Sequence, residues 1–519
     1  MLLQGLKLII LQEMFFNYII KARIDKGENM KPDIREENNY TLLCDFYEFA
    51  MCNGFFEAGF EDKIVYYDMF FRSVPDHASY AIIAGLEQLI DYFENLKFDD
   101  SDIDFLRSKG IFDERYLEYL RNFKFQCDVW AVPEGTVAFP QEPIVIVRGP
   151  IIQAQMVETM VLLTMNHQSM IATKANRIVT AAKGRPVVEF GSRRAQGYTG
   201  ANLGARAAYI GGCAGTANTL AEKLYGVPAL GTMAHSWVQL FPSEYEAFKA
   251  YAEVYPDNCL LLVDTFDTLK KGIPNAIKVF NEVIIPKGFR PKGIRIDSGD
   301  IAYISKKARK MLDDAGFPDA KIMASNSLDE FTIQDLLVQD AKVDSFGVGE
   351  RLITSKSWPV FGGVYKLTTV EEKDGTLIPK IKISENVAKI TTPGFKNLYR
   401  LYDNETGKAL ADVVTLYDET INDTGEYEIF HPIYTWKRRT VTNFTAKPLL
   451  VKIYDKGKLI YDIPKLEEVR NKVQDELETL WEETKRLENP HEYIVDLSYQ
   501  LWKIKEDLLD EHGKTFSRR

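Results

Sequence analysis

The chain has 519 residues, of which 45% are hydrophobic and 27% charged, so it can bury a large core and form two or three domains. Its 75 acidic residues outnumber its 64 basic residues, which gives a formal net charge of -11. Because a nucleic-acid partner needs a basic binding face, this balance argues against one, and anionic ligands must be held by local groups.

Residues 1–29 are predicted to form an extension that precedes the globular part. The segment is apolar, but Lys7 and Glu13 interrupt it and no small-residue cleavage site follows, so we expect no membrane-spanning helix. Met30 offers a second start just before sequence of globular character. The alternative is a helix that lies on a membrane surface.

Residues 30–153 have the pattern of a domain that mixes helices and strands. Helices are expected over residues 80–96 and 102–123. Short apolar runs predict strands at Ile64–Phe71, Gln126–Val132 and Pro143–Arg148. We expect this region to supply scaffold.

Residues 154–360 are predicted to form a parallel α/β barrel or sheet. A long helix over residues 154–184 leads into it and ends at a glycine. Beyond it, apolar strands and amphipathic helices alternate about six times, which is typical of parallel α/β architecture. The expected strands are Pro186–Phe190, Ala229–Gly231, Leu260–Asp264, Gly293–Asp297, Lys321–Ser325 and Val343–Gly347. The expected helices are Thr216–Tyr225, Ser243–Tyr255, Thr268–Val283, Asp300–Asp314 and Leu328–Val338.

The C-terminal region, residues 361–519, is predicted to contain strand-like pieces joined by turns and then a charged helix. That helix carries Leu466, Val469, Val473 and Leu477 on one stripe, which indicates packing against the rest of the protein. The five scattered cysteines of the whole chain are odd in number and never form a CxxC pair. They fit neither a disulfide framework nor a zinc site, so we expect a reducing, cytoplasmic environment.

Reactive or phosphate-gripping residues follow nearly every strand of the 154–360 region. Because the carboxyl ends of parallel strands meet at one edge, we expect these residues to form one ligand site. They are Glu189, His235, Asp264, Asp297, Ser325 with Asn326, and Gly347 with Gly349.

Two of these segments carry the strongest chemical signals. His235 lies in a short loop between a strand and a helix; the alternative is a structural histidine. Arg295 and Asp297 lie on one face of a strand by the period of two. The guanidinium suits a carboxylate or phosphate, whereas Asp297 and Asp300 suit Mg²⁺ or ribose hydroxyls; a purely structural Arg–Asp pair is the alternative.

Phosphate binding is expected at two turns that each lie between a strand and a helix, where backbone amides are free to bind an anion. These turns are Ser325-Asn326-Ser327 and Phe346-Gly347-Val348-Gly349. Arg193 and Arg194 follow an earlier strand and favour a polyanionic ligand. One of these arginines could instead meet a partner subunit or solvent.

An ordered series of motifs resembles that of nicotinate phosphoribosyltransferases from about residue 39 onward. The motifs are CDFY, EFGSRRAQG, AAYIGGCAGTAN, GTMAHSW, LLVDTFDTL, GIRIDSGD, MASNSLDE and FGVGERL. The resemblance implies a type II phosphoribosyltransferase fold of the α/β class: an irregular parallel α/β barrel, an N-terminal α/β sandwich domain and a C-terminal extension of strands and helices. It also implies a homodimer with active sites near the subunit interface.

The resemblance further implies roles for individual residues. Tyr47, Thr232 and Arg295 would contact nicotinate, and His235 would be phosphorylated by ATP as co-substrate. Phosphoribosyl pyrophosphate would be the second substrate, bound with Mg²⁺. The candidate metal ligands are Asp264, Asp297 and Asp300.

Two departures from the family pattern are visible. Cys44 stands where the family often has Thr, and Glu350 follows the GVG segment where a Thr commonly contacts phosphate. Since a carboxylate repels phosphate, Glu350 is expected to turn away and to leave phosphate binding to backbone amides.

The predicted reaction joins nicotinate to the ribose of phosphoribosyl pyrophosphate, with release of pyrophosphate. The alternatives are a nicotinamide or quinolinate phosphoribosyltransferase, or a catalytically silent sensor on the same fold. A silent protein would be expected to have lost His235, Arg295 or Asp297, and all three are present. A carboxylate-reading arginine disfavours an amide substrate.

Overall fold

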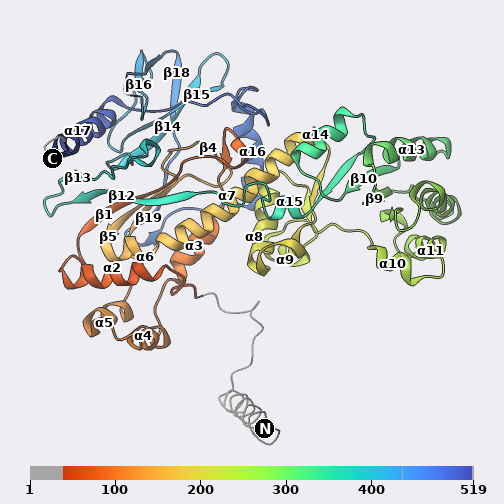
Figure 1. The fold of residues 1–519 in the computed structure, drawn as a ribbon, viewed down its shortest axis with the longest axis horizontal. Helices are drawn as coiled ribbons and strands as arrows, with labels where there is room; N and C mark the ends of the chain where they lie inside the picture. The colour runs from red at the N-terminus through yellow and green to blue at the C-terminus, as the bar shows by residue number, and fades with distance from the viewer. Residues whose placement is uncertain (1–38, 435, 517–519) are drawn as a thin grey trace, which may run out of the picture.

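The computed structural model describes residues 39–434 and 436–516, so the extension predicted over residues 1–29 lies outside the described residues. Three large β-sheets organise the chain (Figure 1). Among the helices of the described residues, none is both long and apolar enough to cross a membrane.

The first sheet is antiparallel and has seven strands in the order β13-β12-β1-β5-β3-β19-β20. The prediction of Ile64–Phe71 is confirmed as β1, whose side chains are nearly all buried. Two of its interior strands, β12 and β19, come from the C-terminal third of the chain and flank strands from the N-terminal part. The bounds are β1 Ile64–Phe71, β3 Asp128–Ala131, β5 Val145–Pro150, β12 Gly363–Glu371, β13 Leu377–Pro379, β19 Val451–Asp455 and β20 Lys458–Leu459.

The helices predicted over residues 80–96 and 102–123 are shorter than expected. A helix begins only after Gly85, whose φ of 110° is a left-handed conformation that ends the preceding segment. Gly110, at φ 66°, separates two helices in the second region. This part comprises α2 Phe46–Glu57, η2 Pro75–His77, β2 Ala81–Ile82, α3 Leu86–Asn95, α4 Asp100–Arg107, α5 Glu114–Arg121, β4 Val137–Ala138 and α6 Ile151–Met156.

The predicted long helix is α7, Glu158–Ala181, which runs between the first sheet and the parallel sheet (Figure 1). Its buried Lys174 places Nζ 2.9 Å from Asp76 Oδ2, 2.9 Å from Glu330 Oε1 and 2.8 Å from Ser357 Oγ. Arg177, one turn later, donates from Nε to Glu330 Oε1 at 2.9 Å. These ion pairs hold the helix to both halves of the protein.

The second sheet is parallel throughout, in the order β7-β6-β11-β10-β9-β8. The predicted strand at Ala229–Gly231 is reduced to an isolated bridge from Ala229 to Thr216, because the Asn218 N–H that would continue the ladder donates instead to Thr216 Oγ1 at 3.0 Å. Within the described residues no ladder joins Ala229 to β8, so the closed barrel is not confirmed. The strands are β6 Val187–Glu189, β7 Gly215–Thr216, β8 Leu260–Leu262, β9 Gly293–Ile296, β10 Lys321–Ser325 and β11 Ser345–Val348.

Helices connect these strands at most of the predicted places. The segment predicted as one helix over residues 268–283 is a short α-helix between two π-helical turns. The elements are η3 Ser192–Arg194, α8 Gly197–Ile210, α9 Thr219–Tyr225, α10 His235–Leu240, α11 Glu244–Val254, η4 Pro256–Asn258, η5 Thr268–Gly272, α12 Ile273–Val279, η6 Phe280–Ile284, η7 Ile285–Lys287, α13 Ile301–Asp314, α14 Glu330–Val338 and α15 Glu350–Ile353.

The third sheet is mixed and follows the order β17-β16-β21-β15-β14-β18. Helix α16 confirms the predicted C-terminal amphipathic helix and packs against α8 and β4. The remaining elements are η8 Val387–Lys389, β14 Lys396–Asp403, β15 Ala409–Leu416, β16 Tyr427–Phe430, β17 Arg438–Val441, β18 Phe444–Pro448, α16 Leu466–Thr479, β21 Val495–Leu497 and α17 Tyr499–Phe516.

Candidate functional site

Arg295 is the centre of a polar cluster at the carboxyl ends of the parallel strands. Its guanidinium donates from Nη2 to Asp297 Oδ1 at 2.8 Å, from Nε to Ser325 Oγ at 2.9 Å and from Nη1 to Thr232 Oγ1 at 3.3 Å. The predicted placement of Arg295 and Asp297 on one side of the strand is confirmed. Only 17% of the arginine side chain is exposed, so its direction is fixed.

An aromatic ring lies beside the same guanidinium. Arg295 Cζ is 5.4 Å from the centroid of the Phe190 ring, at cation–π distance. Phe190 could not be recognised from the sequence, because a phenylalanine after a buried strand is as common in a core as in a site. Arg295 therefore combines a charge for an anion with a neighbouring flat surface.

His235 begins helix α10 and contacts groups from two other strand ends. Its Nδ1 is 3.1 Å from Thr265 Oγ1, and its Nε2 is 3.9 Å from Asp297 Oδ2. The imidazole is 40% exposed, so a ligand can reach it. The structure thus brings His235 together with Asp297 and Arg295, and it adds Thr265, which sequence reasoning missed.

The two carboxylate oxygens of Asp264 differ in their hydrogen bonding. Its Oδ2 accepts from the Asp297 N–H at 3.0 Å and from Ser298 Oγ at 2.6 Å. Its Oδ1 is buried and has no hydrogen-bond partner among the described residues. A buried acceptor without a partner is costly, so this oxygen is poised to accept from a ligand or to bind a cation.

Asp300 lies at the exposed beginning of α13, where its side chain accepts from the Tyr303 N–H at 3.0 Å and caps the helix. It does not join Asp264 and Asp297 in a metal cage, and the described part of the chain contains no group of three acidic, histidine or cysteine side chains placed to hold a metal. Mg²⁺ binding at these carboxylates stays a prediction.

The two turns predicted to bind phosphate differ in the geometry that selects their residues. Asn326 and Ser327 have φ of 90° and 52°, so this turn is a left-handed excursion after β10. Gly347 has no room for a side chain, since a Cβ there would lie 2.5 Å from the Phe190 ring. Gly349 precedes α15, whose first amides are free to bind an anion.

Glu350 turns toward solvent, in line with its departure from the family pattern. Its carboxylate accepts from Lys356 Nζ at 2.6 Å, and this hydrogen bond and ion pair lower the pKa of Glu350. The negative charge is thereby neutralised at the first turn of α15. Phosphate binding there would use backbone amides.

The loop after β6 carries the two adjacent arginines. Glu189 is fully buried and accepts from Thr216 Oγ1 at 2.6 Å and from the Gly191 N–H, and burial raises the pKa of its carboxyl group. These hydrogen bonds fix the start of the loop. Arg193 and Arg194 follow in a short exposed turn, and neither forms an ion pair within the described residues.

Tyr47 lies apart from this cluster within one chain. It belongs to α2 on the half of the molecule that holds the first sheet, whereas β9 and β10 lie on the other half (Figure 1). Its side chain is 45% exposed, and partial burial together with Glu158 raises the pKa of its hydroxyl. The contact of Tyr47 with nicotinate stays a prediction.

Comparison with known proteins covers nearly the whole chain. Family models match in chain order: the nicotinate phosphoribosyltransferase N-terminal domain over residues 42–166, the nicotinate phosphoribosyltransferase family over 186–391 and the corresponding C-terminal domain over 395–505.

Relatives of known name agree with these matches. The nicotinate phosphoribosyltransferase of Bacillus subtilis (strain 168) is 45% identical over 476 residues, which cover 92% of this chain and 96% of that protein. The Homo sapiens enzyme of the same name is 30% identical over 524 residues, covering 90% and 96%. The crystal structure of human nicotinic acid phosphoribosyltransferase matches with a TM-score of 0.80 at 28% identity, covering 90% of this chain and 99% of that one. The chain therefore belongs to the nicotinate phosphoribosyltransferase family of enzymes.

Proposed function

We propose that the protein transfers the phosphoribosyl group of phosphoribosyl pyrophosphate to nicotinate, forming nicotinate mononucleotide and pyrophosphate in the cytoplasm, with ATP hydrolysis coupled through a phosphohistidine at His235. The observation that carries this proposal is the fixed Arg295 guanidinium between Asp297, Ser325 and Thr232, beside the Phe190 ring. The names of the relatives support the same reaction.

Arg295 and Phe190 suit a flat aromatic carboxylate. A guanidinium binds a carboxylate through two parallel hydrogen bonds, and the adjacent ring offers a stacking surface for a pyridine. A carboxamide offers no charge to Arg295, so nicotinamide is expected to bind more weakly. This contact would orient the pyridine nitrogen toward the ribose.

The chemistry needs positioning more than a protein nucleophile. The pyridine nitrogen attacks C1 of the ribose as the bond to pyrophosphate breaks, and the electron pair of that bond leaves with the pyrophosphate. The turns around Asn326 and Gly349 and the exposed Arg193 and Arg194 supply donors and positive charge for the phosphates.

The carboxylates at this edge fit a Mg²⁺ ion that arrives with the pyrophosphate group. Mg²⁺ keeps several waters and binds through one or two carboxylates plus substrate phosphates, which does not need a complete protein cage. Asp264 Oδ1, buried without a hydrogen-bond partner in the described chain, is the oxygen available for it, with Asp297 and Asp300 as further candidates. The ion would neutralise charge on the departing pyrophosphate.

ATP coupling would act through the His235 loop. A ring nitrogen of His235 attacks the γ-phosphorus of ATP and ADP leaves, so the imidazole gains a dianionic group. That charge would repel Asp297, whose Oδ2 lies 3.9 Å from Nε2. We therefore expect the loop to shift and substrate binding to tighten until hydrolysis restores the histidine.

A homodimer would account for the position of Tyr47. The exposed side chains of Leu43, Phe46, Tyr47 and Met51 form an apolar surface at the start of α2. If a second copy covers this surface, Tyr47 can reach the Arg295 cluster of the partner subunit. Mixing a Tyr47→Ala chain with an Arg295→Gln chain should then restore some activity in the mixed dimer.

Pyrophosphate release tests the proposed function directly. With phosphoribosyl pyrophosphate and Mg²⁺, nicotinate should support release, ATP should increase it, and an excess of nicotinamide or quinolinate should compete poorly. Turnover with quinolinate or nicotinamide in preference to nicotinate would contradict the substrate assignment. No release with any of the three pyridines would instead favour a catalytically silent protein.

A further inference from the structure

A cavity lies where the three sheet-bearing parts of the chain meet, and the Arg295 cluster does not line it. It has a volume of about 790 Å³, within the range of small-molecule sites. Its walls come from the segment after β1, from α14 and the residues after α15, and from the loops around β16 and before β21. Arg295, Asp297 and His235 do not line it.

Arg72 gives this cavity a cation that no carboxylate of the described residues pairs with. Its Nε is buried without a hydrogen-bond partner, and no ion pair holds its guanidinium within the described residues. Arg72 is half-buried, and this partial burial lowers the pKa of its guanidinium. The guanidinium lies 5.6 Å from the centroid of the Phe70 ring, and its buried Nε is left to donate to an anionic ligand.

Three of the six histidines of the chain line the same cavity: His77, His431 and His491. Two of the acidic residues on its walls are already paired, Asp76 with Lys174 at 2.9 Å and Asp496 with Arg439 at 2.6 Å. The other two, Glu488 and Glu492, are exposed. His431 is half-buried and His77 and His491 are exposed, so the three imidazoles are accessible to a ligand in the cavity.

Aromatic side chains form another part of the wall. The rings of His77 and Trp358 meet edge to face, with centroids 5.2 Å apart and planes at 80°. Phe331, on α14, also lines the cavity and is 38% exposed, so its ring is available for contact. These surfaces suit a flat aromatic group.

The backbone around the cavity is unusually constrained. Of the eleven described non-glycine residues with positive φ, four line this one cavity. Such conformations persist where surrounding structure fixes them, and they concentrate at ligand sites. The four are Asp76, His77, Gln141 and Asn489.

We propose that this cavity binds a nucleotide, that is, an aromatic base carrying a sugar phosphate. The phosphate is held by Arg72 and the neighbouring imidazoles, and the base lies against Trp358 and Phe331. The site goes beyond the proposed transfer reaction, since it uses none of the residues that hold those substrates.

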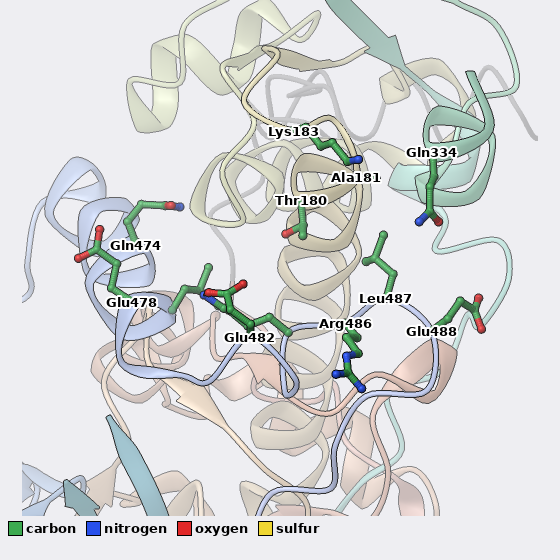
Figure 2. A pocket seen from close by; sticks show the side chains of 12 residues that line it. Thr180, Ala181, Lys183, Gln334, Gln474, Glu478, Glu482, Arg486, Leu487 and Glu488 are labelled. Carbon is green, nitrogen blue, oxygen red and sulfur yellow. The ribbon is translucent and has the colours of Figure 1, made fainter. Parts of the chain in front are cut away.

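A neighbouring pocket provides a matched control. It has a volume of about 590 Å³ and is lined by residues from the end of α7, from α14 and from α16 with the loop after it (Figure 2). Arg486 of that loop lines this smaller pocket and not the larger cavity. Leu487 and Glu488 line both. Replacing Arg486 therefore tests whether any nearby arginine has the same effect.

The experiment is calorimetric titration of the full-length protein with adenosine 5′-monophosphate, adenosine and inorganic phosphate. The nucleotide should bind the wild type and the Arg295→Gln variant with similar affinity at one junction site per chain. Arg72→Gln should weaken this binding at least tenfold, whereas Arg486→Gln should leave it within twofold. Adenosine and phosphate should each bind at least tenfold more weakly than the nucleotide.

Pyrophosphate release by Arg72→Gln should stay within twofold of wild type, which separates this site from the transfer reaction. Far-ultraviolet circular dichroism and thermal melting will show that the variant is folded. The proposal is overturned if the nucleotide does not bind, if Arg295→Gln abolishes binding, or if Arg72→Gln leaves it unchanged. Equal binding of adenosine or of phosphate alone would overturn the assigned ligand class.

Discussion

Asp297 divides its two carboxylate oxygens between Arg295 and His235. Oδ1 accepts from Arg295 Nη2 at 2.8 Å, and Oδ2 lies 3.9 Å from His235 Nε2. One carboxylate thus links the cation proposed to bind nicotinate with the imidazole proposed to accept phosphate from ATP. A change at Asp297 should disturb both functions together.

Asp297→Asn should lower the turnover number about 100-fold, the scale of losing one preorganised charged group in an active site. The amide keeps the shape and one acceptor but removes the negative charge between Arg295 and His235. Pyrophosphate release at saturating substrates measures the effect. Asp267→Asn is a suitable control, because Asp267 only caps a helical turn through the Lys270 N–H and asparagine caps equally well. Activity above half of wild type in Asp297→Asn would contradict this role.

Arg295→Gln should raise the Michaelis constant for nicotinate about 10- to 100-fold, because a charge-assisted hydrogen bond to a carboxylate contributes about 1.5–3 kcal/mol. The Michaelis constant of Arg295→Lys for nicotinate should lie between those of wild type and Arg295→Gln, since an ammonium keeps the charge but cannot form two parallel hydrogen bonds. Initial rates at varied nicotinate give the constants. Arg290→Gln is the control, as Arg290 is exposed and pairs with Asp319. A change in the Michaelis constant for phosphoribosyl pyrophosphate alone would show that Arg295 binds phosphate instead of the nicotinate carboxylate.

His235→Ala should abolish the stimulation of turnover by ATP and leave the slower ATP-independent reaction. Thr265→Val should reduce phosphate incorporation from γ-labelled ATP about tenfold, since its hydroxyl lies 3.1 Å from Nδ1 and orients the ring. Labelled protein is counted after separation from nucleotide. His512→Gln, at an exposed position on α17, should incorporate phosphate like wild type. Full stimulation in His235→Ala would remove the phosphohistidine from the mechanism.

Glu48 should make stability depend on pH. Burial, with a contribution from Glu158, raises the pKa of Glu48 from its ordinary value of 4.5 to about 7. Between these values the folded protein holds a proton that the unfolded chain releases, so this group's contribution to the free energy of unfolding falls as pH rises from about 4.5 to about 7. The slope can reach about 1.4 kcal/mol per pH unit for one proton.

Urea unfolding of wild type and Glu48→Gln across this pH range measures the contribution. Glutamine cannot ionise, so the variant should lose this part of the slope and gain stability relative to wild type at pH 7. Glu57→Gln, which removes an exposed carboxylate paired with Arg115, should keep the wild-type slope. Parallel pH profiles for wild type and Glu48→Gln would show that Glu48 is already ionised in the folded protein.

The sequence predicts local structure well where period and turn chemistry agree. Strands β1 and β10 have the expected bounds, and the period of two placed Arg295 beside Asp297. The segment after Ala229 does not form the predicted strand because the Asn218 N–H that would continue the ladder donates to Thr216 Oγ1, a local competition that an apolar run does not show.

Contacts between distant segments could not be predicted in the same way. Phe190 and Thr265 lie in the site only because separate strands end at one edge of the sheet. Neither residue type indicates a function by itself. The motifs likewise contain no information that β12 and β19 complete the first sheet, because strand pairing depends on partners hundreds of residues away.

That pairing has a consequence for biosynthesis. Strand β3, at Asp128–Ala131, has β5 on one side and β19, at Val451–Asp455, on the other. During translation the N-terminal strands therefore keep unpaired edges until most of the polypeptide has left the ribosome. Such late pairing across a long sequence separation slows folding and exposes the nascent chain to aggregation.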